Sequence, residues 1–373
     1  MALPVWFNLR RAASPLSGRL PVVLRNFRSD AALEALLKAS ENKTPNLVLY
    51  KYPSFSGAYA ALFAHLYHSQ LNIPCVILPF SAVVPLRVED LCIEGLETCY
   101  FLDFLGLGSL ASELTRRTSS KIIGFDHRKS TLSRISTRGD CDANITLNAN
   151  TEKSSCMAAY EYFSAKLSEN RFENDNSMSL LDHKDRERVE TILKYIDDRD
   201  LRSWSLPDAK AFNIGVREWH SKVNCLTNSF MYDQLLEICP TDLITRGNDY
   251  LSRRKTAAKK LLHKVFRVKL GRGIYGECLG FRADGHSDLS DEIGKELSQM
   301  SAAAGLRPIG AVTYMQRNNL KMCLRTTDCS TDTSEVAKAY GGGGSPSSSS
   351  FIIRMDEYNH WISGRHDHGD STL

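Results

Sequence analysis

From about residue 46 onward the chain alternates short apolar runs with longer amphipathic segments, and this alternation limits its fold more than any other feature. Short apolar runs predict buried strands, whereas apolar residues that recur every three to four positions predict helices. Strands and helices that alternate at this spacing indicate βαβ units, and hence an α/β fold with a parallel sheet and flanking helices. The predicted strands are 46–50, 75–80, 98–106 and 121–125, and the predicted helices are 56–69, 108–117, 154–167 and 185–201.

Charged side chains stand at the ends of two of these predicted strands. Asp103 ends the third strand, and Asp126, His127 and Arg128 follow the fourth. Ligands of parallel sheets bind beyond the carboxyl ends of the strands, so these are candidate catalytic and metal-binding residues, and Asp198 on a later helix is a further candidate ligand. Carboxylates and imidazole suit manganese or magnesium with a position open for water. Taken singly, each aspartate is more often a backbone cap and a lone histidine a surface or core residue, but their shared placement favours a site.

The second half of the sequence indicates a smaller α/β domain. After Pro240 the stretch 249–273 is basic and changes from helical to strand-like character, which predicts a helical connector. Strand-like runs then follow at 265–270, 274–281, 309–316, 320–327 and 351–355, with an amphipathic helix near 288–304. The predicted organisation is a first domain at 29–240, a connector at 241–263, a second domain at 264–358 and a tail at 359–373.

A run of four glycines, Gly341, Gly342, Gly343 and Gly344, lies within the Gly/Ser stretch 339–350. Glycines let the backbone approach a ligand closely and can turn amide groups toward an anion. Gly/Ser stretches are more often flexible linkers, and composition alone favours a linker here.

The first 28 residues differ in kind from the rest of the chain. They carry five arginines, and no acidic residue occurs before Asp30. Arg-rich, Ser-containing and acid-poor leaders are typical of import into organelles, so 1–28 is predicted to be a transit peptide for a mitochondrion or plastid. The alternative is a disordered basic tail on a cytoplasmic protein.

The composition excludes several other classes of protein. The formal net charge is only +4, which favours tolerance of anionic ligands over a surface that coats nucleic acid. Ten cysteines occur without a Cys-x-x-Cys pair, so neither a zinc knuckle nor a dithiol redox pair is indicated. No apolar run approaches the roughly 20 residues of a membrane span, so no membrane partner is expected.

The order of these motifs resembles the DHH superfamily of metal-dependent phosphoesterases, in particular the branch that degrades short RNA oligonucleotides or cyclic nucleotides. The resemblance covers about residues 46–358 and is carried by "KYPSFSGAYAAL" (51–62), "YFLDFLG" (100–106), "GFDHRKS" (124–130) and "YIDDRDLRSW" (195–204). It implies metal ligation by Asp103, His127 and Asp198, with Mn²⁺ or Mg²⁺ as the ion. "CLRTT" (323–327) and the glycine run resemble the carboxy-terminal DHHA1 domain, which implies substrate binding by Arg325 and Gly341–Gly344.

The chain departs from the pattern of this superfamily at four positions. Ser56 stands where the first motif has an aspartate before glycine, and Ser54 stands two residues earlier in place of an acid or thiol. Arg128 replaces the second histidine of the third motif, and Ser345 replaces the histidine after the glycines. Arginine can hold a phosphate but cannot donate a proton near neutral pH, because its pKa exceeds ~12. Two-metal phosphoryl transfer needs two ions about 4 Å apart, and these residues supply ligands for one ion at most.

The favoured hypothesis is therefore a DHH-like protein that binds short RNA or nucleotide phosphoesters with impaired catalysis. The alternative is an active manganese-dependent phosphodiesterase that cleaves short oligoribonucleotides or cyclic nucleotides. Ser56, Arg128 and Ser345 discriminate between the two. A homodimer is compatible with either hypothesis.

Overall fold

The structure is a computed structural model of the chain, and it describes residues 29–83, 86–105, 110–131, 143–169, 179–317 and 319–362. The described residues form two compact units. The first comprises those up to Asp182 together with Ser221–Leu235, and the second comprises His183–His220 and those from Leu236 onward. The predicted leader at 1–28 lies outside the described residues, and the domain boundaries drawn from the sequence stay predictions. No helix within the described ranges is long and apolar enough to cross a membrane.

The first unit is built on a five-stranded sheet, called sheet A, whose strands are all parallel. Its order is β2-β1-β3-β4-β5. The strand β2 therefore pairs with one side of β1, and β3, β4 and β5 follow in turn on its other side. The predicted α/β class is confirmed, and the four predicted strands are present. The fifth strand was not predicted. The bounds are β1 Asn46–Lys51, β2 Cys75–Phe80, β3 Thr98–Leu102, β4 Lys121–Asp126 and β5 Ile145–Ala149.

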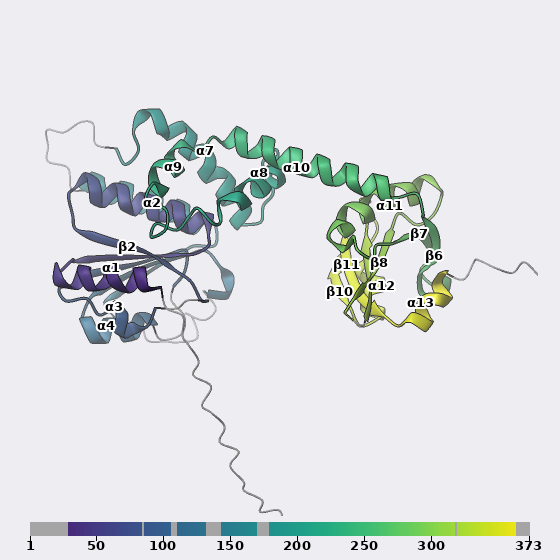
Figure 1. The fold of residues 1–373 in the computed structure, drawn as a ribbon, viewed down its shortest axis with the longest axis horizontal. Helices are drawn as coiled ribbons and strands as arrows, with labels where there is room; N and C mark the ends of the chain where they lie inside the picture. The colour runs from purple at the N-terminus through teal and green to yellow at the C-terminus, as the bar shows by residue number, and fades with distance from the viewer. Residues whose placement is uncertain are drawn as a thin grey trace, which may run out of the picture. The chain divides into compact units, whose positions relative to one another are not determined.

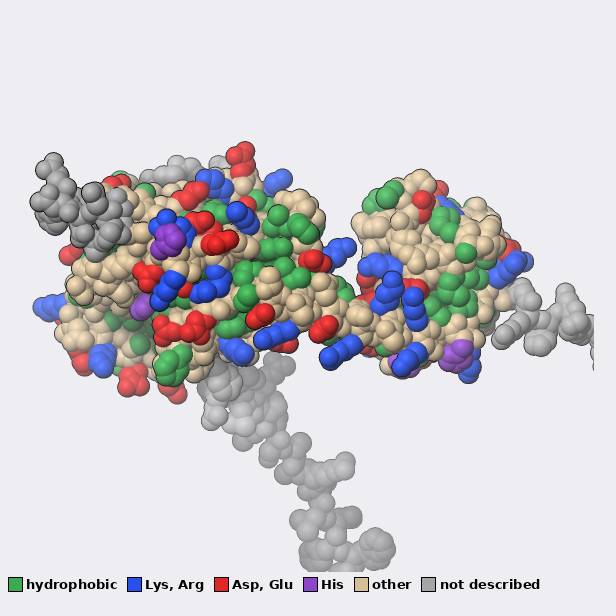
Figure 2. Space-filling view, turned by 90° about the horizontal axis from the view of Figure 1, so that it is seen from above, with side chains coloured by type: hydrophobic (Ala, Val, Ile, Leu, Met, Phe, Trp, Pro, Cys, Tyr) green, Lys and Arg blue, Asp and Glu red, His purple; other side chains and the backbone are tan. Residues whose placement is uncertain are grey.

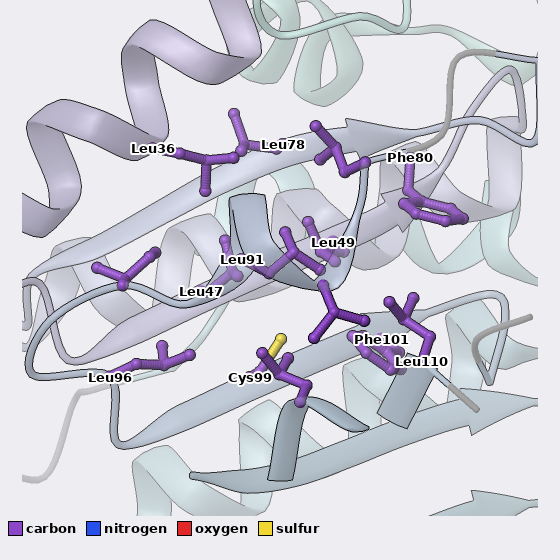
Figure 3. Packing of buried hydrophobic residues seen from close by; sticks show 14 of the residues in the cluster. Leu36, Leu47, Leu49, Leu78, Phe80, Leu91, Leu96, Cys99, Phe101 and Leu110 are labelled. Atoms are coloured by element: carbon purple, nitrogen blue, oxygen red, sulfur yellow. The ribbon is translucent and has the colours of Figure 1, made fainter. Parts of the chain in front are cut away.

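Helices cover both faces of sheet A (Figure 1). On one face lie α1, α3 and α4, and on the other lies α2, which packs against α6. Alternate side chains of the strands enter the first interface, where Leu47 and Leu49 of β1 belong to one cluster with Leu36 of α1, which lies beside Leu78 of β2, and Leu91 of α3 (Figure 3). The bounds are α1 Asp30–Glu41, α2 Phe55–Gln70, α3 Val88–Leu91, α4 Leu110–Thr118, α6 Ser155–Glu169 and α9 Met231–Glu237, which ends in the second unit.

The beginning of α2 is fixed by two residues of the first motif. Ser54 is its N-cap and accepts a hydrogen bond from the amide of Gly57 at 3.1 Å. A side chain at Gly57 would collide with the backbone carbonyl oxygen of Lys51. Glycine therefore lets the first turn of α2 lie directly against the end of β1, and the sequence "SFSG" is explained by this close approach.

The second unit begins with helices. Pro240 is the first residue of α10, where its missing amide hydrogen costs no helical bond. A side chain at Gly247 would collide with the backbone of Ala211, so glycine allows α10 to cross closely over α8. The bounds are α7 His183–Asp200, α8 Ala209–Gly215, η1 Val216–Trp219 and α10 Pro240–Leu261.

A six-stranded sheet, called sheet B, completes the second unit in the order β10-β11-β9-β8-β7-β6. Among its described strands, only β7 and β8 pair in parallel; the other neighbours are antiparallel. The linker prediction for the Gly/Ser stretch is wrong, because β10 and β11 form a hairpin there. The bounds are β6 Phe266–Lys269, η2 Leu270–Gly273, β7 Glu277–Arg282, η3 Ser287–Leu289, α11 Ser290–Ala303, β8 Gly310–Gln316, β9 Asn319–Arg325, α12 Ser334–Ala339, β10 Gly343–Ser345, β11 Ser348–Ile353 and α13 Met355–Ile362.

Candidate functional site

The strand order of sheet A places a switch point between β1 and β3. From there the connections run in opposite directions, and ligands of α/β sheets bind at the carboxyl ends of the strands beside such a point. Lys51 ends β1, Asp103 directly follows β3, and Asp126 ends β4. The structure therefore brings Asp103, Asp126, His127 and Arg128 together at one edge, called the carboxyl edge below.

Asp103 is buried immediately after β3, and its backbone adopts a left-handed conformation with φ of 64°. Its Oδ2 accepts a hydrogen bond of 2.7 Å from the hydroxyl of Ser54. Lys51 Nζ lies 3.9 Å from the same oxygen. Since Ser54 also caps α2, one serine hydroxyl connects the beginning of that helix to Asp103.

His127 lies between Asp103 and the beginning of α6. Its Nδ1 is 2.8 Å from the hydroxyl of Ser155 and 3.7 Å from Asp103 Oδ1. The first distance is a hydrogen bond, and the second is too long for one. The ring is therefore oriented by Ser155, the first residue of α6.

Arg128 turns back onto Asp126. Its Nε donates to Asp126 Oδ1 at 2.7 Å, and its Nη2 donates to Oδ2 at 2.8 Å, so the guanidinium forms a bidentate pair with the carboxylate. The backbone amide of Arg128 and the hydroxyl of Thr131 add bonds of 3.1 and 2.9 Å to the same carboxylate. Arg128 Nη2 also donates to the backbone oxygen of Asp103 at 2.7 Å, which ties the ends of β3 and β4 together.

These contacts lower the pKa of Asp126. Burial alone would raise the pKa of this carboxyl, but the hydrogen bonds and the charge of Arg128, with a contribution from Thr131, hold it below its ordinary value. Asp126 is consequently a carboxylate at neutral pH, and its charge is balanced by Arg128.

Of the four charged side chains described above at the carboxyl edge, the two cations are partly exposed and the two carboxylates are buried. The exposed fractions of the side chains are 40% for Lys51 and 34% for Arg128, against 3% for Asp103 and 2% for Asp126. On the face of the molecule seen in Figure 2, Lys and Arg side chains are interspersed with Asp and Glu. A bound anion would meet cations at this edge before it met a carboxylate.

The side chains of the carboxyl edge do not fit a divalent metal ion. Both oxygens of Asp126 accept hydrogen bonds from Arg128, and Asp103 Oδ2 accepts one from Ser54. Within the described ranges, no group of three or more His, Cys, Asp or Glu side chains is arranged to hold a metal. Divalent ions of this kind need several free oxygen or nitrogen donors and uncompensated negative charge.

Asp198, the third predicted metal ligand, belongs to α7 of the second unit. Its Oδ1 accepts bonds of 2.7 Å from both the amide and the hydroxyl of Ser205. Its Oδ2 is buried and has no hydrogen-bond partner among the described residues. One such oxygen is a single donor and does not form a metal site by itself.

The predicted substrate-binding residues of the second unit make contacts within the chain. Arg325 Nε donates to Asp291 Oδ1 at 2.9 Å, and its Nη1 donates to the backbone oxygens of Leu324 and Ser349. The amides of Gly341 and Gly342 donate to backbone oxygens of α12, which caps the end of that helix. Gly343 and Gly344 pair with β11. Their proposed role in binding substrate stays a prediction.

The two remaining serine departures lie in different surroundings. Ser56 is buried in the first turn of α2, and its hydroxyl has no hydrogen-bond partner among the described residues. Ser345 is exposed at the end of β10, where its hydroxyl donates to the backbone oxygen of Ser348 at 3.4 Å. Neither side chain supplies a charge or a proton donor that could replace an aspartate or a histidine.

Three residues of the carboxyl edge were not predicted from the sequence: Lys51, Thr131 and Ser155. The signal for Lys51 was available, because it directly follows the predicted strand 46–50. Thr131 and Ser155 carried no such signal. Their hydroxyls reach Asp126 and His127 only through the loop after β4 and the beginning of α6.

A cavity of about 650 Å³ lies elsewhere in the first unit, along the first half of β2. The rings of His65 and Tyr232 line it and stack with their centroids 4.1 Å apart. None of the predicted site residues lines this cavity, so it does not serve the carboxyl edge.

No protein-family model matches the chain, and no curated protein matches it. Solved structures do match. The pGpG-specific phosphodiesterase PggH from Vibrio cholerae is 12% identical with a TM-score of 0.39, over 84% of this chain and 94% of that one. RecJ from Thermus thermophilus, determined in complex with Mn²⁺, is 13% identical with a TM-score of 0.37, over 90% and 54%. An exopolyphosphatase-related protein from Bacteroides fragilis is 12% identical with a TM-score of 0.32, over 88% and 94%.

All three structures are only 12–13% identical to the chain, so the likeness concerns the fold alone. These TM-scores all lie below 0.5, so the likeness carries no argument about activity. The chemistry of the carboxyl edge therefore has to be judged from the chain's own side chains, above all from the arginine that follows Asp126 and His127.

Proposed function

We propose that the chain binds short RNA or nucleotide phosphoesters at the carboxyl edge of sheet A and that its catalysis is impaired. The observation that supports this function is the distribution of charge there. Lys51 and Arg128 are accessible charged groups beside the switch point, and Asp103 and Asp126 lie buried behind them. A phosphate binds to exposed ammonium and guanidinium groups through charge-assisted hydrogen bonds.

Lys51 is the principal phosphate contact in this proposal. Arg128 already donates to both oxygens of Asp126, so a phosphate would have to share or compete for that guanidinium. Lys51 lies 3.9 Å from Asp103 Oδ2, which is beyond hydrogen-bonding distance, and its side chain is partly exposed. Its ammonium group can therefore turn toward a ligand without breaking a strong bond.

Impaired catalysis follows from the same residues. Arg128 does not release a proton near neutral pH, so it cannot act as the general acid for a leaving group. Asp126 is held by Arg128 and Thr131 and is too enclosed to serve as a general base. Proton transfer at this edge would therefore depend on the imidazole of His127.

The test is a binding assay with a 5′-phosphorylated RNA dinucleotide that carries a 3′ fluorophore, followed by fluorescence anisotropy with the full-length protein in EDTA. We expect Lys51→Ala to raise Kd about tenfold, since one charge-assisted contact contributes roughly 1.5 kcal/mol. Lys121→Ala is the matched control, because Lys121 is exposed at the opposite end of the same sheet, and its Kd should not change.

The same samples are then incubated with Mn²⁺ and analysed for cleavage. Absence of binding by the wild type, or equal losses in the two lysine variants, would contradict the proposal. Manganese-dependent cleavage that Asp198→Ala abolishes in a folded protein would establish the alternative, an active phosphodiesterase.

A further inference from the structure

Each buried carboxylate of the carboxyl edge already has a cationic side chain nearby. Arg128 donates two hydrogen bonds to Asp126, of 2.7 and 2.8 Å. Lys51 Nζ lies 3.9 Å from Asp103 Oδ2. The charge of Asp126 is therefore balanced by a bonded guanidinium without any bound ion, and Lys51 lies within ion-pair distance of Asp103. A divalent cation gains its affinity from negative charge that nothing else has neutralised, and at Asp126 that charge is not left over.

The position of the guanidinium is a second obstacle to a divalent ion. Arg128 Nη2 donates both to Asp126 Oδ2 and to the backbone oxygen of Asp103, at 2.8 and 2.7 Å. It lies between the ends of β3 and β4. An ion that bridged the two carboxylates would first have to displace this group from Asp126.

We infer that Arg128 takes the place of a divalent cation at the carboxyl edge, as a cation that is covalently part of the chain. It holds Asp126 and the end of β3 in position, and the wild-type edge therefore binds no divalent metal ion. Replacing Arg128 by histidine should release both side-chain oxygens of Asp126 from the guanidinium, next to His127 and a new imidazole, and leave only the bonds from Thr131 and the backbone amide of residue 128. That change should create a site for Mn²⁺ where the wild type has none.

The experiment is a titration of the full-length protein with Mn²⁺, in which the free ion is counted by electron paramagnetic resonance. The informative quantity is the Mn²⁺ that Asp126→Asn removes. We expect the wild type and Asp126→Asn to bind equal amounts. We expect Arg128→His to bind one more ion per chain than the double variant Arg128→His/Asp126→Asn. Lys121→His, which adds an imidazole at the opposite edge, should bind no more than the wild type.

Three results would overturn the inference. The first is a loss of bound Mn²⁺ when Asp126→Asn is made in the wild type. The second is equal binding by Arg128→His and the double variant when both are folded by circular dichroism. The third is an equal gain in Lys121→His. If Asp126→Asn does not fold in the wild type, Asp103→Asn tests the other buried carboxylate of the edge, and a loss of bound Mn²⁺ in that variant would likewise overturn the inference.

The titration contains no nucleotide, so its outcome is separate from that of the proposed function. Phosphoester binding in EDTA could fail while Arg128 still excludes the metal. Conversely, Mn²⁺ could bind to the wild-type carboxylates while the dinucleotide also binds.

Discussion

Replacing Arg128 by methionine should destabilise the first compact unit, because it leaves a buried carboxylate without its cation. Asp126 would lose two bonds from the guanidinium, and only 2% of its side chain is exposed to water. Removing one partner of a buried ion pair costs about 3–5 kcal/mol. Since 34% of the Arg128 side chain is exposed, water screens the pair, and we expect a loss of about 2 kcal/mol.

The loss of stability in Arg128→Met should become smaller as the pH falls. In the wild type the pKa of Asp126 lies below its ordinary value, so its contribution to stability is present above the unfolded pKa and disappears as the pH falls through the folded pKa. In Arg128→Met the effect of burial remains and raises the pKa of Asp126, so the folded state favours the protonated carboxyl. The difference between the two proteins should be largest near pH 7 and should shrink toward about pH 4.

Differential scanning calorimetry at several pH values measures this difference. For a unit of this size, about 2 kcal/mol lowers Tm by about 4–8 °C. Arg117→Met is the matched control, because Arg117 pairs with Glu89 on the surface at 2.9 Å and both side chains are about half exposed. It should lower Tm by about 2 °C or less. Equal shifts in the two variants, or a shift for Arg128→Met that does not change with pH, would refute the reasoning.

Three further predictions concern individual contacts. Gly57→Ala should destabilise the first unit by roughly 2 kcal/mol or more, since its Cβ would collide with backbone at the end of β1, and urea denaturation would measure the loss. Ser54→Ala should cost about 1–2 kcal/mol in the same assay, because the helix cap and the bond to Asp103 are lost together, whereas Ser54→Thr should retain most of the stability. Gly342→Ala should lower the Tm of the second unit, because its Cβ would collide with β11, whereas Gly343→Ala, with open space around it, should not.

The sequence predicted sheet A well because of where its strands lie. The strands β1, β3 and β4 are covered on both faces, so they are nearly continuous apolar runs that can be recognised without any contacts. The strand β5 was missed because it is a half-buried edge strand with the polar sequence "ITLNA", which lacks this signal. The helix α1 was also not predicted, although its buried residues Ala32, Leu36 and Ala39 recur at helical spacing just after the predicted leader.

The Gly/Ser stretch shows where composition misleads. Four glycines and a run of serines are typical of a linker, but each glycine here has a definite conformation or partner. Gly341 has a φ of 72° at the end of α12, and Gly342 lies too close to β11 to carry a side chain. The hairpin depends on pairing with β9 and on packing, and neither can be deduced from residue types alone.

At the carboxyl edge, too, some properties follow from the residue types, whereas others depend on the geometry. The identity of Arg128 was enough to exclude proton donation, because guanidinium pKa values hardly vary between proteins. It was not enough to tell whether the side chain faces a ligand or its own neighbour two residues earlier. In the structure it faces Asp126 and, through Nη2, the backbone of Asp103. A histidine at this position could not make both contacts through one planar group with parallel donors. Arg128 therefore makes Asp126 one half of an internal ion pair, which occupies both carboxylate oxygens. Of the two cations at this edge, Lys51 is the less constrained, because its nitrogen lies 3.9 Å from the nearest carboxylate oxygen.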